Sequence, residues 1–139
     1  MRNKPKLHIG GSSTDERGTI FHNNDYDFSG VSRAYIIENM SIELKRGWKG
    51  HLVEKRWFFC TKGGMRIDVI DINDLKDNIS NVTTYTLRED RLDILEVPPG
   101  YATLIQQIKK NSRIVALSDY KLGETDDDNL RWNYNHLEI

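Results

Sequence analysis

The pattern of apolar and polar positions along the chain predicts short β-strands and little helix. Several segments are rich in β-branched and aromatic residues and are either continuously apolar or alternate between apolar and polar positions. Only Asn73–Asp77 suggests a helical turn. The predicted strands are Val31–Ile37, Trp57–Thr61, Met65–Val69, Thr83–Leu87, Leu92–Val97, Tyr101–Ile108 and Arg113–Leu117.

Turn signals separate these segments. Lys62-Gly63-Gly64 stands between two predicted strands and suggests a hairpin, and Pro98-Pro99-Gly100 ends another strand. Short strands with turns about every ten residues are typical of an antiparallel sandwich or barrel. We find no longer repeat, low-complexity tract or linker, so residues 1–139 are predicted to form a single all-β domain.

Composition narrows the possible partners and compartments. The 20 Lys and Arg residues nearly balance 21 Asp and Glu residues, so no broad basic field is available for nucleic acid. No apolar run approaches the roughly 20 residues that a membrane-spanning helix needs, and the N-terminus lacks a signal core. The single cysteine, Cys60, excludes an internal disulfide framework and is predicted to be a buried thiol. We therefore expect a cytoplasmic protein without membrane insertion.

Candidate chemistry concentrates in Arg46-Gly47-Trp48-Lys49-Gly50-His51 and in Lys55–Phe59, which follows it closely. Cations mixed with aromatic rings suit a pocket for an anionic, ring-shaped ligand. Lys49 and His51 are two positions apart, so a regular strand places them on the same face.

Two features near the C-terminus give weaker expectations. The acidic run Asp126-Asp127-Asp128 is predicted to be a solvated turn. The following Asn129–Tyr134 carries two aromatic residues, so we expect this tail to dock on a surface, with a partner subunit as one candidate.

An ordered set of motifs from about Thr14 to Asn133 resembles the dTDP-4-dehydrorhamnose 3,5-epimerase family and its short sugar-epimerase relatives. The strand around Arg46 also has a weaker similarity to the dTDP-sugar 3,4-ketoisomerases, which share an Arg-Gly-x-His-x-His strand. The motifs that carry the resemblance are Asp15-Glu16-Arg17-Gly18, Glu38-Asn39-Met40-Ser41, the Arg46-Gly47 strand, the Gly63 turn, Val97-Pro98-Pro99-Gly100-Tyr101-Ala102 and Asp128-Asn129-Leu130-Arg131-Trp132-Asn133.

The resemblance implies a cupin-type jelly roll, a homodimer, and chemistry without a metal or cofactor. It implies a dTDP-linked, or UDP-linked, 4-keto-hexose as substrate, in the synthesis of sugars for surface polysaccharides. The ketone acidifies the neighbouring C–H, so a base, an enolate-stabilising cation and an acid suffice for epimerisation or isomerisation.

The same resemblance assigns the catalytic residues. His51 matches the second histidine of the ketoisomerase strand, and Tyr35 matches a tyrosine on the preceding strand. Lys49 stands where the epimerases have their catalytic histidine. Three roles therefore remain open for Lys49. It is expected to act as a base if it is desolvated, to stabilise the enolate or bind phosphate as a cation, or to be an ordinary strand lysine.

Four further residues are predicted to bind the substrate. Arg46 and Arg17 match diphosphate-binding arginines, and Arg17 belongs to an N-terminal arm that is a candidate to enter the partner subunit's pocket. Arg56 replaces a lysine near the reacting sugar, and Asn39 matches a residue near the thymine base. Thr103 stands where the family has another histidine. Metal-binding cupins need histidines at the positions of Lys49 and Thr103, and the lysine ammonium would repel a divalent ion, so no metal site is predicted. These losses leave an alternative: a catalytically silent cupin that binds a sugar nucleotide or carbohydrate.

Overall fold

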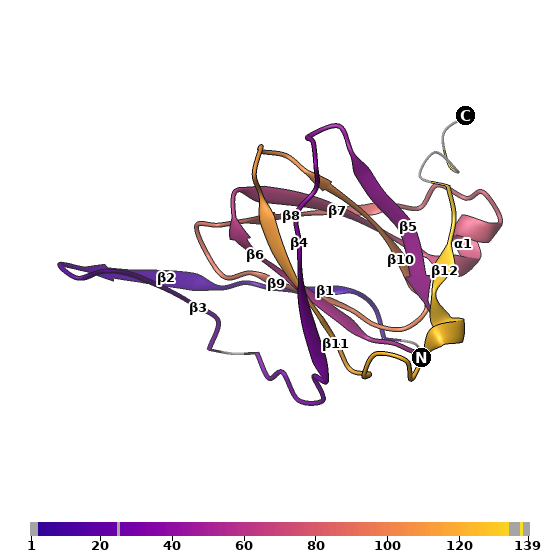
Figure 1. The fold of residues 1–139 in the computed structure, drawn as a ribbon, viewed down its shortest axis with the longest axis horizontal. Coiled ribbons are helices and arrows are strands. Elements are labelled where there is room, and N and C mark those ends of the chain that lie inside the picture. The colour runs from indigo at the N-terminus through magenta and orange to yellow at the C-terminus, as the bar shows by residue number, and fades with distance from the viewer. Residues whose placement is uncertain (1–2, 25, 134–136, 138–139) are drawn as a thin grey trace.

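The computed structural model describes residues 3–24, 26–133 and 137 and consists of two packed antiparallel sheets (Figure 1). The sheet that contains β4 has the strand order β1 (Lys6–His8), β9 (Ile94–Val97), β6 (Arg56–Lys62), β11 (Arg113–Ser118), β4 (Arg33–Ile37). The sheet that contains β5 has the order β12 (Leu130–Arg131), β5 (Lys45–His51), β10 (Tyr101–Gln107), β7 (Gly64–Asp71), β8 (Thr83–Arg88). This arrangement confirms the all-β, cupin-type jelly roll.

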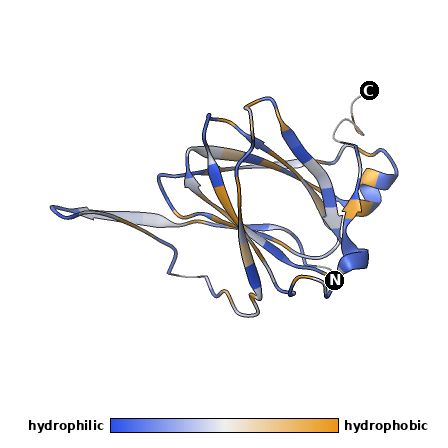
Figure 2. Cartoon of the chain, in the orientation of Figure 1, coloured by the Kyte–Doolittle hydropathy of each residue, from blue (hydrophilic) through white to orange (hydrophobic). Residues whose placement is uncertain are grey.

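The main core lies between the two sheets. Alternate residues of the central strands point inward, so that β7 contributes Met65, Ile67 and Val69 to this layer while β6 contributes Phe58 and Cys60. The free thiol of Cys60 is buried, as predicted. Figure 2 shows apolar residues in the strands of the sandwich and in α1 (Ile72–Lys76), and polar residues through η1 (Asp126–Asp128).

The predicted hairpin at Gly63-Gly64 is wrong. β6 pairs with β9 and β11 in one sheet, whereas β7 pairs with β8 and β10 in the other, so the two glycines carry the chain between sheets. Gly63 has a φ of 72°, and a Cβ at this position would lie 2.2 Å from Ser112 Oγ. The sequence marks a sharp turn correctly, but turn residues do not say which strands pair afterwards.

The N-terminal third contains strands that the sequence pattern did not predict. β2 (Gly11–Asp15) and β3 (Gly18–His22) pair only with each other and form a hairpin that projects from the sandwich (Figure 1). Their residues are mostly exposed, including Ile20 and Phe21, so they lack the half-buried alternation that identifies a strand.

The C-terminal tail docks on its own chain. β12 pairs with β5, and Leu130 and Trp132 pack against a second apolar cluster on the outer face of that sheet. A partner subunit is therefore not needed to cover Trp132, while Tyr134 lies outside the described residues. The second cluster consists of Trp48, Ile70, Ile72, Leu75, Ala102 and Leu104.

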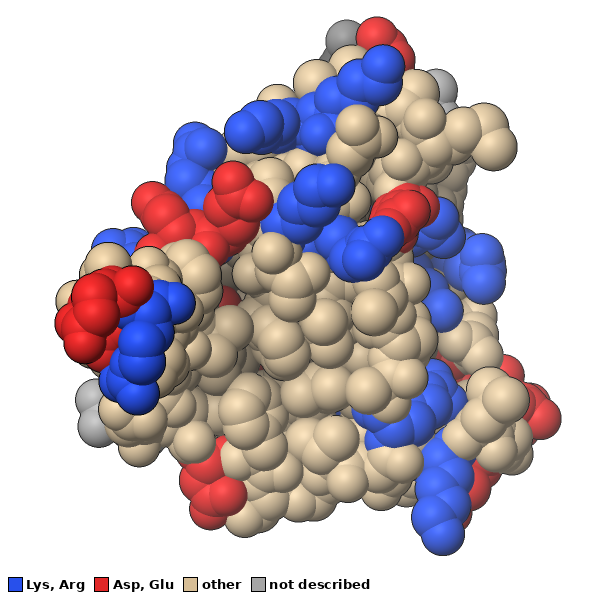
Figure 3. All heavy atoms as spheres, turned by 60° about the vertical axis from the view of Figure 1, so that its left-hand side comes forward, with Lys and Arg blue, Asp and Glu red and all other residues tan. Residues whose placement is uncertain are grey.

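No helix among the described residues is long and apolar enough to cross a membrane. On the face shown in Figure 3, basic and acidic residues lie in small separate groups on a larger uncharged surface. A specific cavity is thus a better candidate for ligand binding than a charged surface.

Candidate active site

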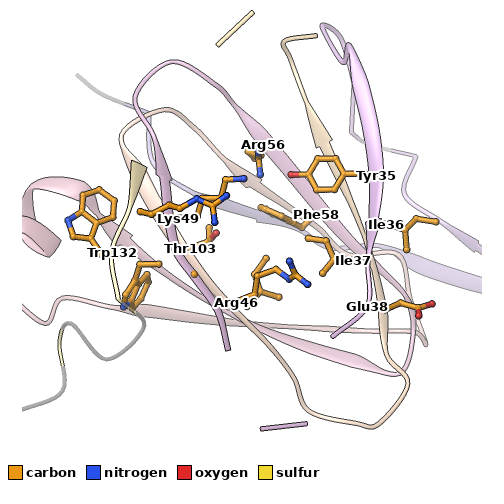
Figure 4. A pocket seen from close by; sticks show the side chains of 14 residues that line it. Tyr35, Ile36, Ile37, Glu38, Arg46, Lys49, Arg56, Phe58, Thr103 and Trp132 are labelled. Atoms are coloured by element: carbon orange, nitrogen blue, oxygen red, sulfur yellow. The ribbon is translucent and has the colours of Figure 1, made fainter. Parts of the chain in front are cut away.

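A cavity of about 370 Å³ opens between the two sheets. Its walls come from β4 and β6 on one side and from β5, β10, β12 and Trp132 on the other (Figure 4). The lining residues are Tyr35, Ile36, Ile37, Glu38, Arg46, Gly47, Trp48, Lys49, Arg56, Phe58, Thr103, Ile105, Arg131 and Trp132.

A β-bulge in β5 places Arg46 at this cavity. Thr103 is the partner of Lys49 and Leu104 is the partner of Gly47, so Trp48 is the extra residue. The extra residue shifts the alternation of the residues that precede it in β5 by one position. Arg46 is therefore the cross-strand partner of Ile105 and, like Ile105, faces inward. Without the bulge, Arg46 would share the outer face with Trp48.

The lining of the cavity carries an excess of positive charge. Arg46, Lys49, Arg56 and Arg131 contribute four cations, and Glu38 is the only acidic residue among the described residues of the lining. Glu38 already forms an ion pair with Arg113. The cavity therefore offers cations whose charge is not balanced by lining carboxylates.

Arg56 is the most buried of these cations, with 7% of its surface exposed. Its guanidinium lies 5.5 Å from the centre of the Tyr35 ring, within the range of a cation–π contact. Two of its nitrogens, Nε and Nη2, have no hydrogen-bond partner in the described structure. Its Nε lies 3.6 Å from Glu54 Oε1, an ion pair without a hydrogen bond, so the guanidinium keeps donor capacity for an anionic or carbonyl oxygen.

Lys49 is half-buried in the cavity wall opposite β4, and Figure 4 shows its side chain directed inward. Burial lowers the pKa of Lys49 to about 8, and the positive charges of Arg56 and Arg131 add to the effect. A substantial fraction of Lys49 is therefore a neutral amine near pH 8.

Tyr35 faces this lysine from the other sheet, since it lies on β4. Burial raises the pKa of Tyr35, although the charges of Arg56 and Arg33 oppose the shift. Its hydroxyl is consequently protonated at neutral pH and available as a proton donor.

His51 lies on the same inner face as Lys49, two residues further along β5, but it does not line the cavity. It is 5% exposed, and its Nδ1 is 3.5 Å from Glu54 Oε2 and 3.6 Å from Asp128 Oδ2. Burial lowers the pKa of His51 to about 4, Arg56 adds to this, and the two carboxylates oppose it. Because carboxylates only accept, the remaining proton belongs on Nδ1, and Nε2 is left as the basic nitrogen.

Glu54 is the centre of the charge network beneath the cavity, with 1% of its surface exposed. Its carboxylate accepts hydrogen bonds from Ser118 Oγ and from Thr125 Oγ1, and it lies 3.6 Å from Arg56 Nε. Burial alone raises its pKa, but these hydrogen bonds and the nearby charges of His51 and Arg56 hold the pKa below the usual value.

Asp128 corrects the prediction that the acidic run is merely solvated. It is 6% exposed, and its carboxylate accepts hydrogen bonds from the backbone N–H groups of Leu52, Val53 and Glu54. This contact fixes the loop that leads from His51 to β6.

We expect Asp128→Ala to lower the free energy of unfolding by about 3 kcal/mol, because three backbone donors lose a charged acceptor. Asp127→Ala removes an exposed carboxylate of the same run and should change the free energy by less than about 0.5 kcal/mol. Urea unfolding of both variants measures the difference. Equal midpoints for the two variants would contradict the role given to Asp128.

His51, Glu54 and Asp128 also meet the spacing of a divalent-metal site, with ligand atoms within 4.8 Å of one another. However, both carboxylates already accept hydrogen bonds from hydroxyl or backbone groups. Arg33 and Arg56 also lie 3.3 Å and 3.6 Å from Glu54. This donor set fits an internally paired network better than a metal, and metal-free chemistry stays a prediction.

The remaining predicted residues divide between the cavity and the hairpin. Asn39 is 7% exposed and accepts a hydrogen bond from Arg46 Nε at 3.2 Å, so it positions a lining residue without lining the cavity. Arg17 lies on the projecting hairpin, paired with Asp15, and does not reach the cavity of its own chain.

The sequence pattern did not identify Arg131 and Trp132 as site residues. Both belong to the tail that pairs with β5, and Arg131 is the cross-strand partner of Lys49. The sequence predicts that Trp132 docks on a surface, but it does not predict that the tail pairs with β5, because pairing between distant strands leaves no local signal.

Comparison with solved structures finds the same fold in two groups of sugar-nucleotide enzymes. A histidine-to-asparagine variant of the 3,4-ketoisomerase QdtA from Thermoanaerobacterium thermosaccharolyticum, in complex with TDP-4-keto-6-deoxyglucose, matches with a TM-score of 0.72 and 18% identity over 99% of this chain and 94% of that one. A dTDP-4-dehydrorhamnose 3,5-epimerase from Bacillus anthracis, with TDP and PPi bound, matches with a TM-score of 0.76 and 16% identity over 97% and 83%.

The RmlC epimerase of Mycobacterium tuberculosis gives a TM-score of 0.78 at 16% identity, over 97% of this chain and 72% of that one. No profile of a known protein family and no curated protein sequence matches the chain. The likeness therefore establishes the shared fold that the motifs predicted, at identities too low to transfer an activity.

Proposed function

We propose that the chain is an isomerase that moves protons on a nucleotide-linked 4-keto-hexose, as an epimerase or ketoisomerase. A dTDP-linked or UDP-linked sugar is the proposed substrate, and the chemistry uses no metal. The single observation that carries the proposal is the cationic cavity lined by Arg56, which is 7% exposed and has two nitrogens without a hydrogen bond among the described residues. A diphosphate and a ketone oxygen supply the acceptors that these cations lack.

The roles follow from the positions of the residues. Arg46, with its side chain held by Asn39, binds the diphosphate, and Arg56 approaches the reacting sugar. Tyr35 on β4 and Lys49 on β5 face the ligand from opposite walls, and the neutral His51 lies deeper on the lysine side. We assign the base to His51, the proton donor to Tyr35 and stabilisation of the developing negative charge to Lys49.

The proposal includes a homodimer. An isolated two-stranded hairpin is marginally stable in water, so the projecting β2–β3 hairpin is better explained by contact with a second copy of the chain. Arg17 on this hairpin would then complete the diphosphate site of the partner. A cytoplasmic role in making sugars for surface polysaccharides is part of the same proposal.

One observation favours the alternative of a silent binding protein. Among the described residues no histidine lines the cavity, because Lys49 and Thr103 stand at the two positions where the resembled enzymes have histidines, and His51 is not part of the lining. Such a protein would bind the sugar nucleotide without promoting proton transfer.

Exchange of carbon-bound hydrogen separates the two functions. TDP-4-keto-6-deoxyglucose is incubated with the protein in deuterated water and followed by NMR and mass spectrometry. We expect deuterium next to the ketone at a rate well above the protein-free rate, and a UDP-4-keto sugar is tested in parallel. Binding seen by thermal shift without exchange on either sugar would favour the silent binder.

We expect Arg131→Ala to weaken TDP binding about tenfold, the loss typical of one charge-assisted hydrogen bond. Arg66→Ala is the matched control, because Arg66 is paired with Asp68 and does not line the cavity. Isothermal titration calorimetry measures both affinities. An unchanged affinity for TDP in the Arg131 variant would show that Arg131 does not contact the ligand.

A further inference from the structure

We propose that the Lys49 amine is a nucleophile that forms an imine with the carbonyl group of the anionic ligand bound in the cavity. This inference rests on the proposed function and states how Lys49 would stabilise negative charge there. It adds a covalent step to what would otherwise be a purely electrostatic role.

The surroundings of Lys49 are those of a reactive amine. Its two cross-strand partners are Arg131 on β12 and Thr103 on β10, so a cation lies on one side and a neutral hydroxyl on the other. Arg56 contributes a further buried positive charge from the opposite sheet. Within the described part of the chain, Lys49 forms no ion pair with a carboxylate, and Glu38 in the same lining is paired with Arg113.

Burial and the charges of Arg56, Arg131 and Arg33 favour the neutral amine, which is the nucleophilic form, and the charge of Glu54 opposes them. Desolvation and nearby cations are the two ways by which proteins activate a lysine for imine formation. The pKa of about 8 for Lys49 agrees with this geometry. Lys55, four residues after His51, has different contacts, because it lies 3.6 Å from Glu96 Oε1 and over the Trp57 ring.

The step balances without any further reagent. The protonated amine and the ketone give a protonated imine and one water molecule, in which the former carbonyl oxygen leaves with two protons from the nitrogen. Transfer of a proton from the neighbouring carbon to the proposed base His51 then gives a neutral enamine, and return of a proton to that carbon restores the iminium. Water hydrolyses it to the ketone and the protonated lysine. An iminium accepts the electron pair of the broken C–H bond more readily than a ketone does.

Pyridoxal 5′-phosphate is the first probe, because it joins an aldehyde to a phosphate and does not require the proposed substrate. The protein is incubated with it, reduced with borohydride, and analysed by intact mass and peptide mapping. We expect a single dominant adduct on Lys49 that increases as the pH rises through about 8. The adduct should be lost in Lys49→Arg, which keeps the charge, and retained in Lys55→Arg.

The same trapping with TDP-4-keto-6-deoxyglucose, beside the exchange assay, separates the two proposals. Adducts of pyridoxal phosphate and of the sugar at Lys49 support both the imine and the proposed function. Labelling of Lys49 by pyridoxal phosphate, with neither sugar adduct nor exchange, supports the nucleophile and refutes the proposed function. Exchange without any sugar adduct at Lys49 overturns the imine and leaves the isomerase. Labelling spread over surface lysines, with no preference for Lys49, also overturns it.

Discussion

His51→Asn is expected to reduce the rate of hydrogen exchange on the 4-keto sugar by about 10³-fold, within the range for loss of a general base. The imidazole is the proposed base, and an asparagine amide in its place cannot accept a carbon-bound proton. The amide can still donate a hydrogen bond toward Glu54 and Asp128, which lie 3.5 Å and 3.6 Å from the imidazole. The fold should therefore survive the change.

The control for this variant is His8→Asn. His8 lies 3.4 Å from Glu96 and away from the cavity, so its replacement should leave exchange unchanged. Circular dichroism and the affinity for TDP check that His51→Asn is folded and still binds, since His51 does not line the cavity. Undiminished exchange in His51→Asn would remove this residue from the mechanism.

The pH dependence of exchange distinguishes the two basic groups. His51 has a pKa of about 4, so it is already neutral throughout the range from about pH 5 upward. Lys49 has a pKa of about 8, so its neutral form increases as the pH rises toward that value. If Lys49 acts through the imine, the rate should rise with pH toward about 8 and show no step near 6.5, the ordinary pKa of histidine. A Lys49 that acts only through its positive charge would instead give a rate that falls as the pH rises through about 8.

Local sequence pattern was sufficient for most of the sandwich. The strands at 57–61, 65–69, 83–87 and 101–108 were predicted within a few residues of β6, β7, β8 and β10, because buried faces impose an apolar pattern. The exposed β2–β3 hairpin lacks that pattern and was missed. The pairing of β6 with β7 was predicted wrongly, because a turn shows that the chain reverses but not that the two strands beside it belong to the same sheet.

The site was predictable where it lies on one strand and unpredictable where it is assembled from distant segments. Arg46 and Lys49 were identified from β5 and its motif, and both line the cavity. Nothing local shows that Glu54 is buried, because its environment includes Ser118 and Thr125, more than sixty residues away. Charged residues are mostly exposed, so a buried glutamate that contacts several polar and charged side chains is not expected from sequence.

Glu54→Gln is expected to lower the free energy of unfolding by about 4 kcal/mol at neutral pH, as breaking a buried ion pair does. The amide keeps the size of the side chain but removes the charge that faces Arg33 at 3.3 Å and Arg56 at 3.6 Å. Arg56, which is 7% exposed, would then be left in the interior without its counter-charge. Urea unfolding measures the loss. Glu38→Gln is the control, because it removes a carboxylate from a solvent-exposed pair with Arg113 and should cost less than about 1 kcal/mol.

Acid should remove the difference between wild type and Glu54→Gln. The folded pKa of Glu54 lies below its ordinary value of 4.5, so its contribution is fully present above about 4.5 and is lost as the pH falls through the folded pKa. His51 acts over a higher range, because the unfolded chain binds a proton near 6.5 and the folded chain only near 4, so wild-type stability declines as the pH falls from about 6.5. Stability curves against pH should therefore show an early decline shared by wild type and Glu54→Gln, followed by convergence of the two at low pH. A Glu54→Gln protein as stable as Glu38→Gln at neutral pH would show that the buried carboxylate does not hold the arginines beneath the cavity.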